Sequence, residues 1–205
     1  MTALSIRIMT KADLVDIVEV HQRAFQGFFI EQMGPPFIKA YYNILLTYGG
    51  SIAYVYHGKS GAIEGFVVGF VEPKAFYKKF VRSSLQLIIP IFFGIIRNPQ
   101  LLIKILGNIR RITSVTNQSS KFVIDSATAE LSSIAVVSSA KGIGSLLIEA
   151  FAKDVWSRGL TSITLTTDSE NNELANNFYT KHGFVRNGLE ERNGRKLWRY
   201  TVTNE

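Results

Sequence analysis

The chain has 205 residues, of which 46% are hydrophobic and 19% are charged, and it contains no cysteine. This composition supports a sizeable core and excludes a mainly disordered chain, which would bury too little apolar surface to offset the entropy of ordering. The lack of cysteine excludes disulfides, zinc–thiolate sites, iron–sulfur clusters and a cysteine nucleophile. The length predicts a single domain over residues 1–205.

Charge is distributed unevenly along the chain. The net charge is +7, and the segment Pro73–Ile124 contains no aspartate or glutamate. The longest apolar run, Leu85–Ile96, is shorter than the ~20 residues that a membrane-spanning helix needs. Charged residues interrupt Met1–Val20, unlike the apolar centre of a signal peptide. We therefore expect a soluble, cytoplasmic protein whose basic character belongs to one segment.

The first part of the chain predicts a strand, two helices and a hairpin, in that order. Thr10 precedes Asp13 in a helix-starting Thr-x-x-acid pattern, and Gly49-Gly50 is typical of a helix end. The expected strands are Leu4–Met9, Ser51–His57 and Ala62–Glu72, and the expected helices start after Thr10 and near Pro35.

The basic segment predicts helices, and the C-terminal part alternates strands with helices. The helices expected in the segment are Ala75–Ser84, Leu85–Arg97 and Pro99–Ile112, with breaks at Pro90, Gly94 and Pro99 and a polar loop at Thr113–Ser120. The later strands are expected at Ala129–Val137, Ser162–Thr167, Phe184–Gly188 and Lys196–Val202, and the later helices at Ile143–Arg158 and Asn172–His182. This order predicts an α/β (α+β) fold, a mixed central sheet flanked by helices, with a helical insertion after the third strand at about residues 74–113.

Lys141-Gly142-Ile143-Gly144-Ser145 is the sharpest local pattern, because it follows an apolar strand and opens a helix. Backbone N–H groups at a helix start point outward and favour an anion such as a pyrophosphate. Two glycines would let such a ligand approach the backbone closely. The alternative is a glycine turn that merely starts the helix, because Gly-x-Gly alone is a weak signal.

A second motif lies near the C-terminus. Residues 172–184 read Asn-x-x-Ala-x-x-Phe-Tyr-x-x-x-Gly-Phe. Together with the preceding strands, the Gly-x-Gly helix start and the hairpin stretch Gly65-Phe66-Val67-Val68-Gly69, this motif resembles the GNAT superfamily of N-acetyltransferases. The resemblance covers most of the chain. It implies the GNAT fold and acetyl-CoA as the cofactor, and no metal-ligand pattern accompanies it.

The resemblance also implies which residues bind the coenzyme. In such enzymes an open strand edge pairs with the amides of the pantetheine arm, and here that edge is Ile134, Ala135 and Val136. Backbone amides of the glycine loop hold the pyrophosphate, which implies Lys141, Gly142, Ile143, Gly144 and Ser145. Asn172 corresponds to an asparagine that bonds the coenzyme or fills the gap between the separated strands.

Two residues correspond to catalytic positions of the family. Tyr179 lies where the family's tyrosine protonates the leaving thiolate, and a phenol suits this role because it is neutral at pH 7. Its alternative role is an aromatic packed against the sheet. Glu130 lies six residues before Val136, where some family members carry a glutamate base. Its alternative role is a solvated strand residue or a structural ion-pair partner.

The glycine loop departs from the family pattern at Ser139. The family carries arginine or glutamine at this position, and the loop here is about two residues shorter. Loss of a charged hydrogen bond costs about 1.5–3 kcal/mol. The departure implies weaker coenzyme binding or a different loop path, unless Lys141 compensates.

Three interpretations of the insertion remain open. Its helices pack on the domain or on a second subunit, lie on an anionic membrane surface, or form a lid over an acidic or phosphorylated acceptor. Nucleic acid is not expected, because the segment is too apolar for a phosphate-tracking groove.

The leading hypothesis is an acetyl-CoA-dependent N-acetyltransferase acting on a small amine. The insertion favours an amino sugar on a nucleotide or another phosphorylated carrier as the acceptor. The alternative is a non-catalytic acyl-CoA-binding protein, or one that interacts with a membrane surface, built on the same fold.

Overall fold

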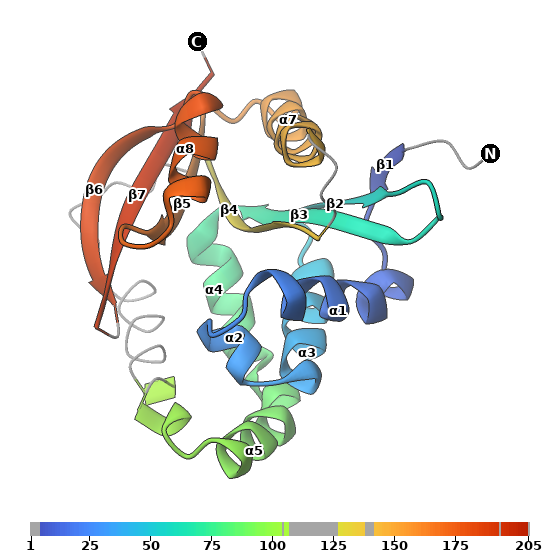
Figure 1. The fold of residues 1–205 in the computed structure, drawn as a ribbon, viewed down its shortest axis with the longest axis vertical. Coiled ribbons are helices and arrows are strands. Elements are labelled where there is room, and N and C mark those ends of the chain that lie inside the picture. Colours follow the sequence, from blue (N-terminus) through green and yellow to red (C-terminus); the bar gives the residue numbers. More distant parts are fainter. Residues whose placement is uncertain (1–4, 104, 107–126, 138–141, 193, 205) are drawn as a thin grey trace.

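The computed structural model of the protein describes residues 5–103, 105–106, 127–137, 142–192 and 194–204 (Figure 1). Within these residues one seven-stranded sheet has the strand order β1-β2-β3-β4-β5-β7-β6. The strands are β1 (Ser5–Ile8), β2 (Ser51–His57), β3 (Ile63–Val71), β4 (Thr128–Val136), β5 (Ser162–Asp168), β6 (Val185–Arg192) and β7 (Arg195–Thr203). The helices are η1 (Lys11–Asp13), α1 (Leu14–Ala24), α2 (Phe29–Gln32), α3 (Pro35–Leu46), α4 (Pro73–Arg82), η2 (Ser84–Leu87), α5 (Ile88–Arg97), α7 (Ile143–Ser157) and α8 (Glu173–Lys181). The predicted α/β fold with a mixed, helix-flanked sheet is confirmed.

Local signals account for the two predicted N-terminal helix starts. The Asp13 carboxylate accepts a 2.7 Å hydrogen bond from the backbone N–H of Thr10 and two more from the Arg7 guanidinium. Pro35 occupies the first position of α3, where its fixed φ suits a helix and its missing N–H has no partner to lose. Both predicted starts are therefore confirmed.

Strand β4 is irregular on one edge and, as far as the described residues go, largely unpaired on the other. Val68 of β3 pairs with Ser133, whereas Gly69 pairs with Leu131, so Ser132 is an extra residue in β4. Such a β-bulge interrupts the ladder and bends the strand. On its other edge β4 pairs in parallel with β5 only from Thr128 to Glu130. Beyond Glu130 the two strands separate.

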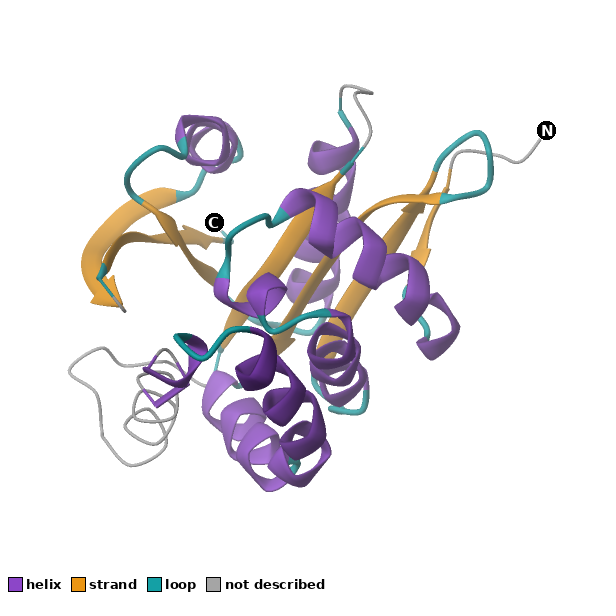
Figure 2. Cartoon of the chain, turned by 60° about the horizontal axis from the view of Figure 1, so that its bottom comes forward, coloured by secondary structure: helices purple, strands orange, loops and turns teal. Residues whose placement is uncertain are grey.

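Helices cover both faces of the sheet (Figure 1). On one face α7 packs Leu147 and Phe151 into a buried cluster that includes Tyr179 of α8. On the other face α1, α3 and α4 pack into a second cluster, which contains Tyr42 and Phe76. Figure 2 shows the C-terminal strands diverging from the central strands, as the short β4–β5 pairing requires.

The described part of the basic segment is helical and packs on α3. Leu87, Leu101 and Ile105 share a third buried cluster with residues of α3. The predicted breaks at Pro90 and Gly94 are wrong. Pro90 lies in the first turn of α5, where proline is tolerated, and Gly94 lies inside α5 against Met33. The loop expected at 113–120 lies outside the described residues.

The outer face of α5 is apolar. Ile88, Ile89, Phe92, Phe93 and Ile96 are each more than half exposed. In the described chain no single helix has both the length and the hydropathy needed to span a membrane. Two consecutive helices, Pro73–Arg82 and Leu85–Arg97, reach that length and hydropathy only when taken together, and they are bent by 64° relative to each other. The segment therefore has one face packed on α3 and one uncovered apolar face.

Candidate active site

A cavity of about 680 Å³ lies where β4 and β5 separate. Its size is within the range of about 300–1,000 Å³ that ligand pockets occupy. The wall on the sheet side is lined by Glu130, Leu131, Ser132, Ser133, Ile134, Thr166, Thr167, Asp168, Tyr179, Arg192, Arg195 and Leu197. The structure thus brings three of the sequence-predicted residues, Glu130, Ile134 and Tyr179, to one cavity.

Glu130 is the last residue of β4 that pairs with β5. Its side chain is half-buried, and its Oε1 accepts a 2.7 Å hydrogen bond from the hydroxyl of Tyr77 on α4. A hydrogen bond to a charged group contributes about 1.5–3 kcal/mol, so Tyr77 holds the carboxylate in place at the cavity wall. The insertion therefore contributes directly to the surroundings of Glu130.

The bulge in β4 lies at the centre of the sheet-side wall. The Ser132 Oγ lies 2.6 Å from the hydroxyl of Tyr41 on α3, which ties the bulge to the opposite wall. Beyond the bulge Ile134 lines the cavity, Ala135 is buried in the cluster with α1 and α3, and Val136 packs in the cluster with α7. Ala135 and Val136 therefore have only backbone groups to offer to the gap between the strands.

Tyr179 is both a core residue and a cavity residue. Only 8% of it is exposed, and the rings of Phe178, Phe184 and Tyr200 lie 5.4 Å, 5.8 Å and 5.8 Å away between centroids. Burial raises the pKa of Tyr179 well above its usual value, and the nearby Tyr200 adds to the rise. Its hydroxyl therefore keeps its proton and can act as a hydrogen-bond donor.

Asn172 lies at the start of α8 and faces β5 rather than β4. Its Nδ2 donates a 2.7 Å hydrogen bond to Oγ1 of Thr167, a cavity-lining residue. Sequence reasoning missed Asn176, one turn later, which is 5% exposed. Its Nδ2 donates to the Asp168 carbonyl, and its Oδ1 accepts a bond from the Tyr200 hydroxyl. The available signal was the second asparagine four residues after Asn172.

The glycine pattern begins α7, and its two glycines differ. Gly142 has φ +95° with open space where a side chain would be, a backbone that favours glycine. A Cβ on Gly144 would lie 3.2 Å from the Phe178 ring, so close packing of α8 accounts for this glycine. Ser145 Oγ lies 3.0 Å from Nε2 of His182 at the end of α8. Ser139 and Lys141 lie outside the described residues.

The opposite wall of the cavity is built from residues 21–105 and is mainly aromatic. Its apolar and aromatic members are Phe25, Phe28, Phe29, Ile30, Met33, Phe37, Tyr41, Phe76, Tyr77, Phe80, Val81, Leu87, Ile91 and Ile105. His21 also lines it. The His21 Nδ1 lies 2.8 Å from the Tyr42 hydroxyl, and burial lowers the pKa of His21 to about 4. No local pattern in the sequence points to this wall, because its residues meet only in the folded chain.

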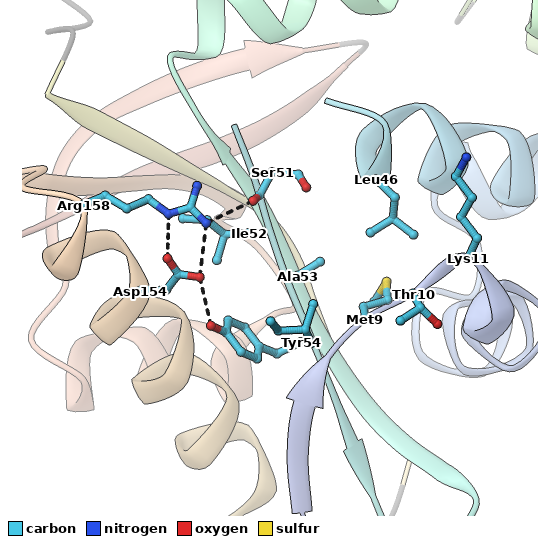
Figure 3. Close-up of a pocket in the computed structure, with 11 residues that line it drawn as sticks. Met9, Thr10, Lys11, Leu46, Ser51, Ile52, Ala53, Tyr54, Asp154 and Arg158 are labelled. Carbon is cyan, nitrogen blue, oxygen red and sulfur yellow. Dashed lines mark hydrogen bonds and ion pairs between the residues drawn. The ribbon is translucent and has the colours of Figure 1, made fainter. Parts of the chain in front are cut away.

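A smaller cavity of about 250 Å³ lies beside β2, away from these residues (Figure 3). Asp154 of α7 accepts hydrogen bonds from the Tyr54 hydroxyl at 2.9 Å and from Arg158 Nε at 2.6 Å. Arg158 also donates to the Ser51 carbonyl. These contacts fasten the end of α7 to β2, and none of the residues predicted for the site lines this cavity.

The comparisons with known structures agree with this fold. The chain is similar to ribosomal-protein-alanine N-acetyltransferase from Brucella melitensis, with 15% identity, a TM-score of 0.60 and coverage of 98% of this chain and 100% of that one. It is also similar to PaiA N-acetyltransferase from Thermoplasma acidophilum in complex with coenzyme A, with 12% identity, a TM-score of 0.55 and coverage of 97% of this chain and 98% of that one. A third similar structure is the spermidine/spermine N-acetyltransferase from Vibrio cholerae, with 16% identity, a TM-score of 0.56 and coverage of 99% of this chain and 95% of that one. At these identities the similarity shows the fold alone.

No curated protein matches the chain. The model of the acetyltransferase (GNAT) family matches residues 16–184, which include both walls of the cavity except for the β6–β7 hairpin. Members of this family transfer an acetyl group from acetyl-CoA. The chain belongs to the acetyltransferase (GNAT) family.

Proposed function

We propose that this N-acetyltransferase acetylates a small amine bound in the cavity between β4 and the helices, with Glu130 and Tyr179 as its catalytic residues. One observation carries the proposal: a carboxylate, a neutral phenol and an open strand edge line the same cavity. These are the three groups that acyl transfer to an amine requires, namely a base, a proton donor and backbone N–H groups for the oxyanion.

The described residues fit the coenzyme. Among the described residues the edge of β4 beyond Glu130 pairs with no strand, so backbone groups of Ile134, Ala135 and Val136 can pair with amides. The N-terminus of α7 supplies N–H groups from Ile143 to Ser145 that lack intrahelical partners, next to the open space at Gly142. We propose that these residues hold the pantetheine arm and the pyrophosphate. When bound, acetyl-CoA supplies an activated thioester carbonyl.

The residues act in a direct displacement. Glu130 takes a proton from the amine, directly or through a water, and Tyr77 holds the carboxylate for this step. Bound acetyl-CoA would supply the carbonyl carbon to which the amine nitrogen bonds and the sulfur that leaves as the carbon–sulfur bond breaks. A backbone N–H of the Ile134–Val136 edge donates to the oxygen as its charge develops. Tyr179 would give its proton to the leaving sulfur, which departs as a thiol, and would regain a proton from solvent as Glu130 releases the one it took from the amine.

Release of free thiol from acetyl-CoA tests this proposal. With a reacting amine we expect amine-dependent thiol release, lowered about 100-fold by Glu130→Gln, a loss typical of general acid–base catalysis. Calorimetric titration with acetyl-CoA should show saturable binding that Gly142→Glu weakens. Binding without thiol release from any amine would instead support the alternative, a non-catalytic acyl-CoA-binding protein.

The sequence-based hypothesis of an amino sugar on a phosphorylated carrier requires cations for the phosphate. In the described cavity the lining cations are Arg192 and Arg195, and each forms an ion pair, with Glu190 and Asp168 respectively. The hypothesis therefore predicts that a nucleotide amino sugar reacts with a lower KM than the free amino sugar. Equal KM values would contradict it.

We further propose that the uncovered apolar face of α5 contacts either an anionic membrane surface or a second subunit. The basic side chains of Lys78 and Arg82 on α4 support contact with an anionic membrane. The exposed Phe92 and Phe93 support contact with either partner. Co-sedimentation with phosphatidylglycerol vesicles tests the first, and sedimentation velocity at increasing protein concentration tests the second. Phe92→Ser should reduce whichever association occurs.

A further inference from the structure

The two walls of the large cavity differ in chemical character. The lining residues contributed by residues 21–105 include no Lys, Arg, Asp or Glu, within the described chain. Most of them present only aromatic or aliphatic side chains, among them Phe28, Phe29, Phe37, Phe76, Phe80 and Ile91. Charged groups occur only on the sheet side. A ligand that fills this cavity therefore meets an apolar surface on one side and charges on the other.

The described basic residues of the insertion add no charge to the helical wall of the cavity. Among the described ones, Lys74, Lys78, Lys79, Arg82 and Arg97 do not line the cavity. The segment thus directs its apolar side chains inward at this point and its described cations elsewhere. An anionic acceptor would find no described cation of the insertion beside it.

The charges of the sheet-side wall suit a cation. Both lining arginines form ion pairs with carboxylates, Arg192 with Glu190 and Arg195 with Asp168. Glu130 accepts a hydrogen bond from the neutral Tyr77 hydroxyl. An ammonium group beside Glu130 therefore gains a favourable charge interaction, whereas a phosphate there would be repelled.

The apolar wall has few polar atoms to satisfy. The hydroxyls of Tyr41 and Tyr77 interact with Ser132 and Glu130. The Nε2 of His21 has no hydrogen-bond partner among the described residues, and His21 is only 3% exposed. An apolar ligand body would therefore cover this wall and leave few polar groups without a partner.

We propose that the acceptor is a primary amine carried on a bulky apolar body, aromatic or aliphatic, which lies against the helical wall while its nitrogen lies beside Glu130. This inference rests on the proposed function and names its substrate class. An acetyl group has only two carbons, so the donor leaves most of the apolar wall to the acceptor. Pockets of this kind bind mainly through apolar contact, with a few polar groups fixing orientation.

A series of linear amines tests the proposal with the full chain and saturating acetyl-CoA. Ethylamine, butylamine and hexylamine have similar basicity and differ only in apolar length. Each buried methylene should lower KM by up to about fourfold, with little change in kcat, because contacts far from the reacting atoms bind substrate and transition state alike. Phenethylamine should resemble hexylamine, whereas ethanolamine, glucosamine and spermidine should react less efficiently.

Two isoleucines of α5 provide a matched pair of variants. Ile91 is half-buried and lines the cavity, whereas Ile89 is 68% exposed and does not. Ile91→Lys should raise the KM of hexylamine about tenfold or more and that of ethylamine much less, and Ile89→Lys should change neither. If Ile91→Lys does not fold, Ile91→Thr should give a smaller change of the same kind, about threefold for hexylamine.

The outcomes separate this inference from the proposed function. Transfer that is insensitive to chain length, or fastest to a polar amine, overturns the apolar acceptor while the acetyltransferase reaction stands. Saturable calorimetric binding of hexylamine in the presence of coenzyme A, weakened by Ile91→Lys but without turnover, supports the acceptor class and contradicts the reaction. Faster acylation of ethylamine by octanoyl-CoA than by acetyl-CoA, lost in Ile91→Lys, would assign the apolar wall to the acyl chain and overturn the proposal.

Discussion

The hydroxyl of Tyr77 donates a 2.7 Å hydrogen bond to Oε1 of Glu130. Tyr77 lies on α4 in the basic segment, and Glu130 lies in the central sheet at the point where β4 leaves β5. The segment that is least typical of the family in sequence thus supplies a partner to the proposed base.

Tyr77→Phe should lower kcat/KM about tenfold or more, because a hydrogen bond to a charged group contributes about 1.5–3 kcal/mol. The loss should appear mainly in kcat, since the ring and its packing remain. Tyr48→Phe is the matched control: the Tyr48 hydroxyl donates to the Val71 carbonyl at 3.1 Å, and Tyr48 does not line the cavity. Steady-state kinetics that show equal losses in the two variants would contradict a role for Tyr77 at the site.

Tyr179→Phe should lower kcat about 10- to 100-fold without changing the shape of its pH profile below about pH 10. Burial raises the pKa of Tyr179, so the phenol remains protonated throughout this range and titrates only above it. The measurement is kcat from pH 6 to pH 10 for the two proteins. If kcat of the wild-type protein falls at alkaline pH and that of Tyr179→Phe does not, the phenol loses its proton within this range, which would contradict a pKa raised by burial.

His21 should make the protein less stable as the pH falls from about 6.5 to 4. Burial lowers the pKa of His21 to about 4 in the folded state, so the unfolded chain binds more protons in this window. The free energy of unfolding then decreases with falling pH, by up to roughly 3 kcal/mol. Urea unfolding at several pH values should show this slope in the wild-type protein and not in His21→Gln. Arg7 lowers the pKa of Asp13 to about 2. Protonation of Asp13 therefore lowers the free energy of unfolding only below about pH 3.8, outside the window of His21.

Arg195→Lys should raise the KM of the amine about threefold with kcat nearly unchanged. The Arg195 guanidinium donates two bonds to the Asp168 carboxylate and lies 4.6 Å from the centroid of the Phe28 ring, so it joins the two walls of the cavity. Lysine keeps the charge but lacks the planar fork that makes both contacts. Arg158→Lys is the matched control and should leave KM unchanged, because Arg158 pairs with Asp154 beside the smaller cavity and does not line the large one.

The order of strands and helices could be predicted from the sequence because each element depends mainly on a local pattern of residues. Alternating apolar residues, the Thr10–Asp13 helix start and the Pro35 helix start are each visible within a few positions of the chain. The breaks expected at Pro90 and Gly94 show the limit of that approach. Whether a proline or glycine ends a helix depends on its position in the turn and on a neighbour such as Met33, and neither is visible locally.

The site could be predicted only where the sequence motif carries it. Glu130 and Tyr179 were identified by their spacing in the family pattern, and both line the same cavity, although their catalytic roles remain proposals. The aromatic wall, the Tyr77 contact and the bulge at Ser132 depend on residues that are distant in sequence. A register irregularity belongs to two strands at once, so one strand read alone cannot show it.

The extra residue at Ser132 has a consequence for how the sheet would respond to selection. Deleting it would preserve both neighbouring registers, Val68 with Ser133 and Gly69 with Leu131, and would make the ladder continuous. A chain under pressure for rigidity alone would therefore gain by losing one residue here, because the bulge leaves Ser132 outside the ladder. Functional sites commonly retain such locally unfavourable features. The irregularity in β4 thus exchanges a continuous ladder with β3 for a bend that lies two residues beyond the last pair with β5, at Glu130.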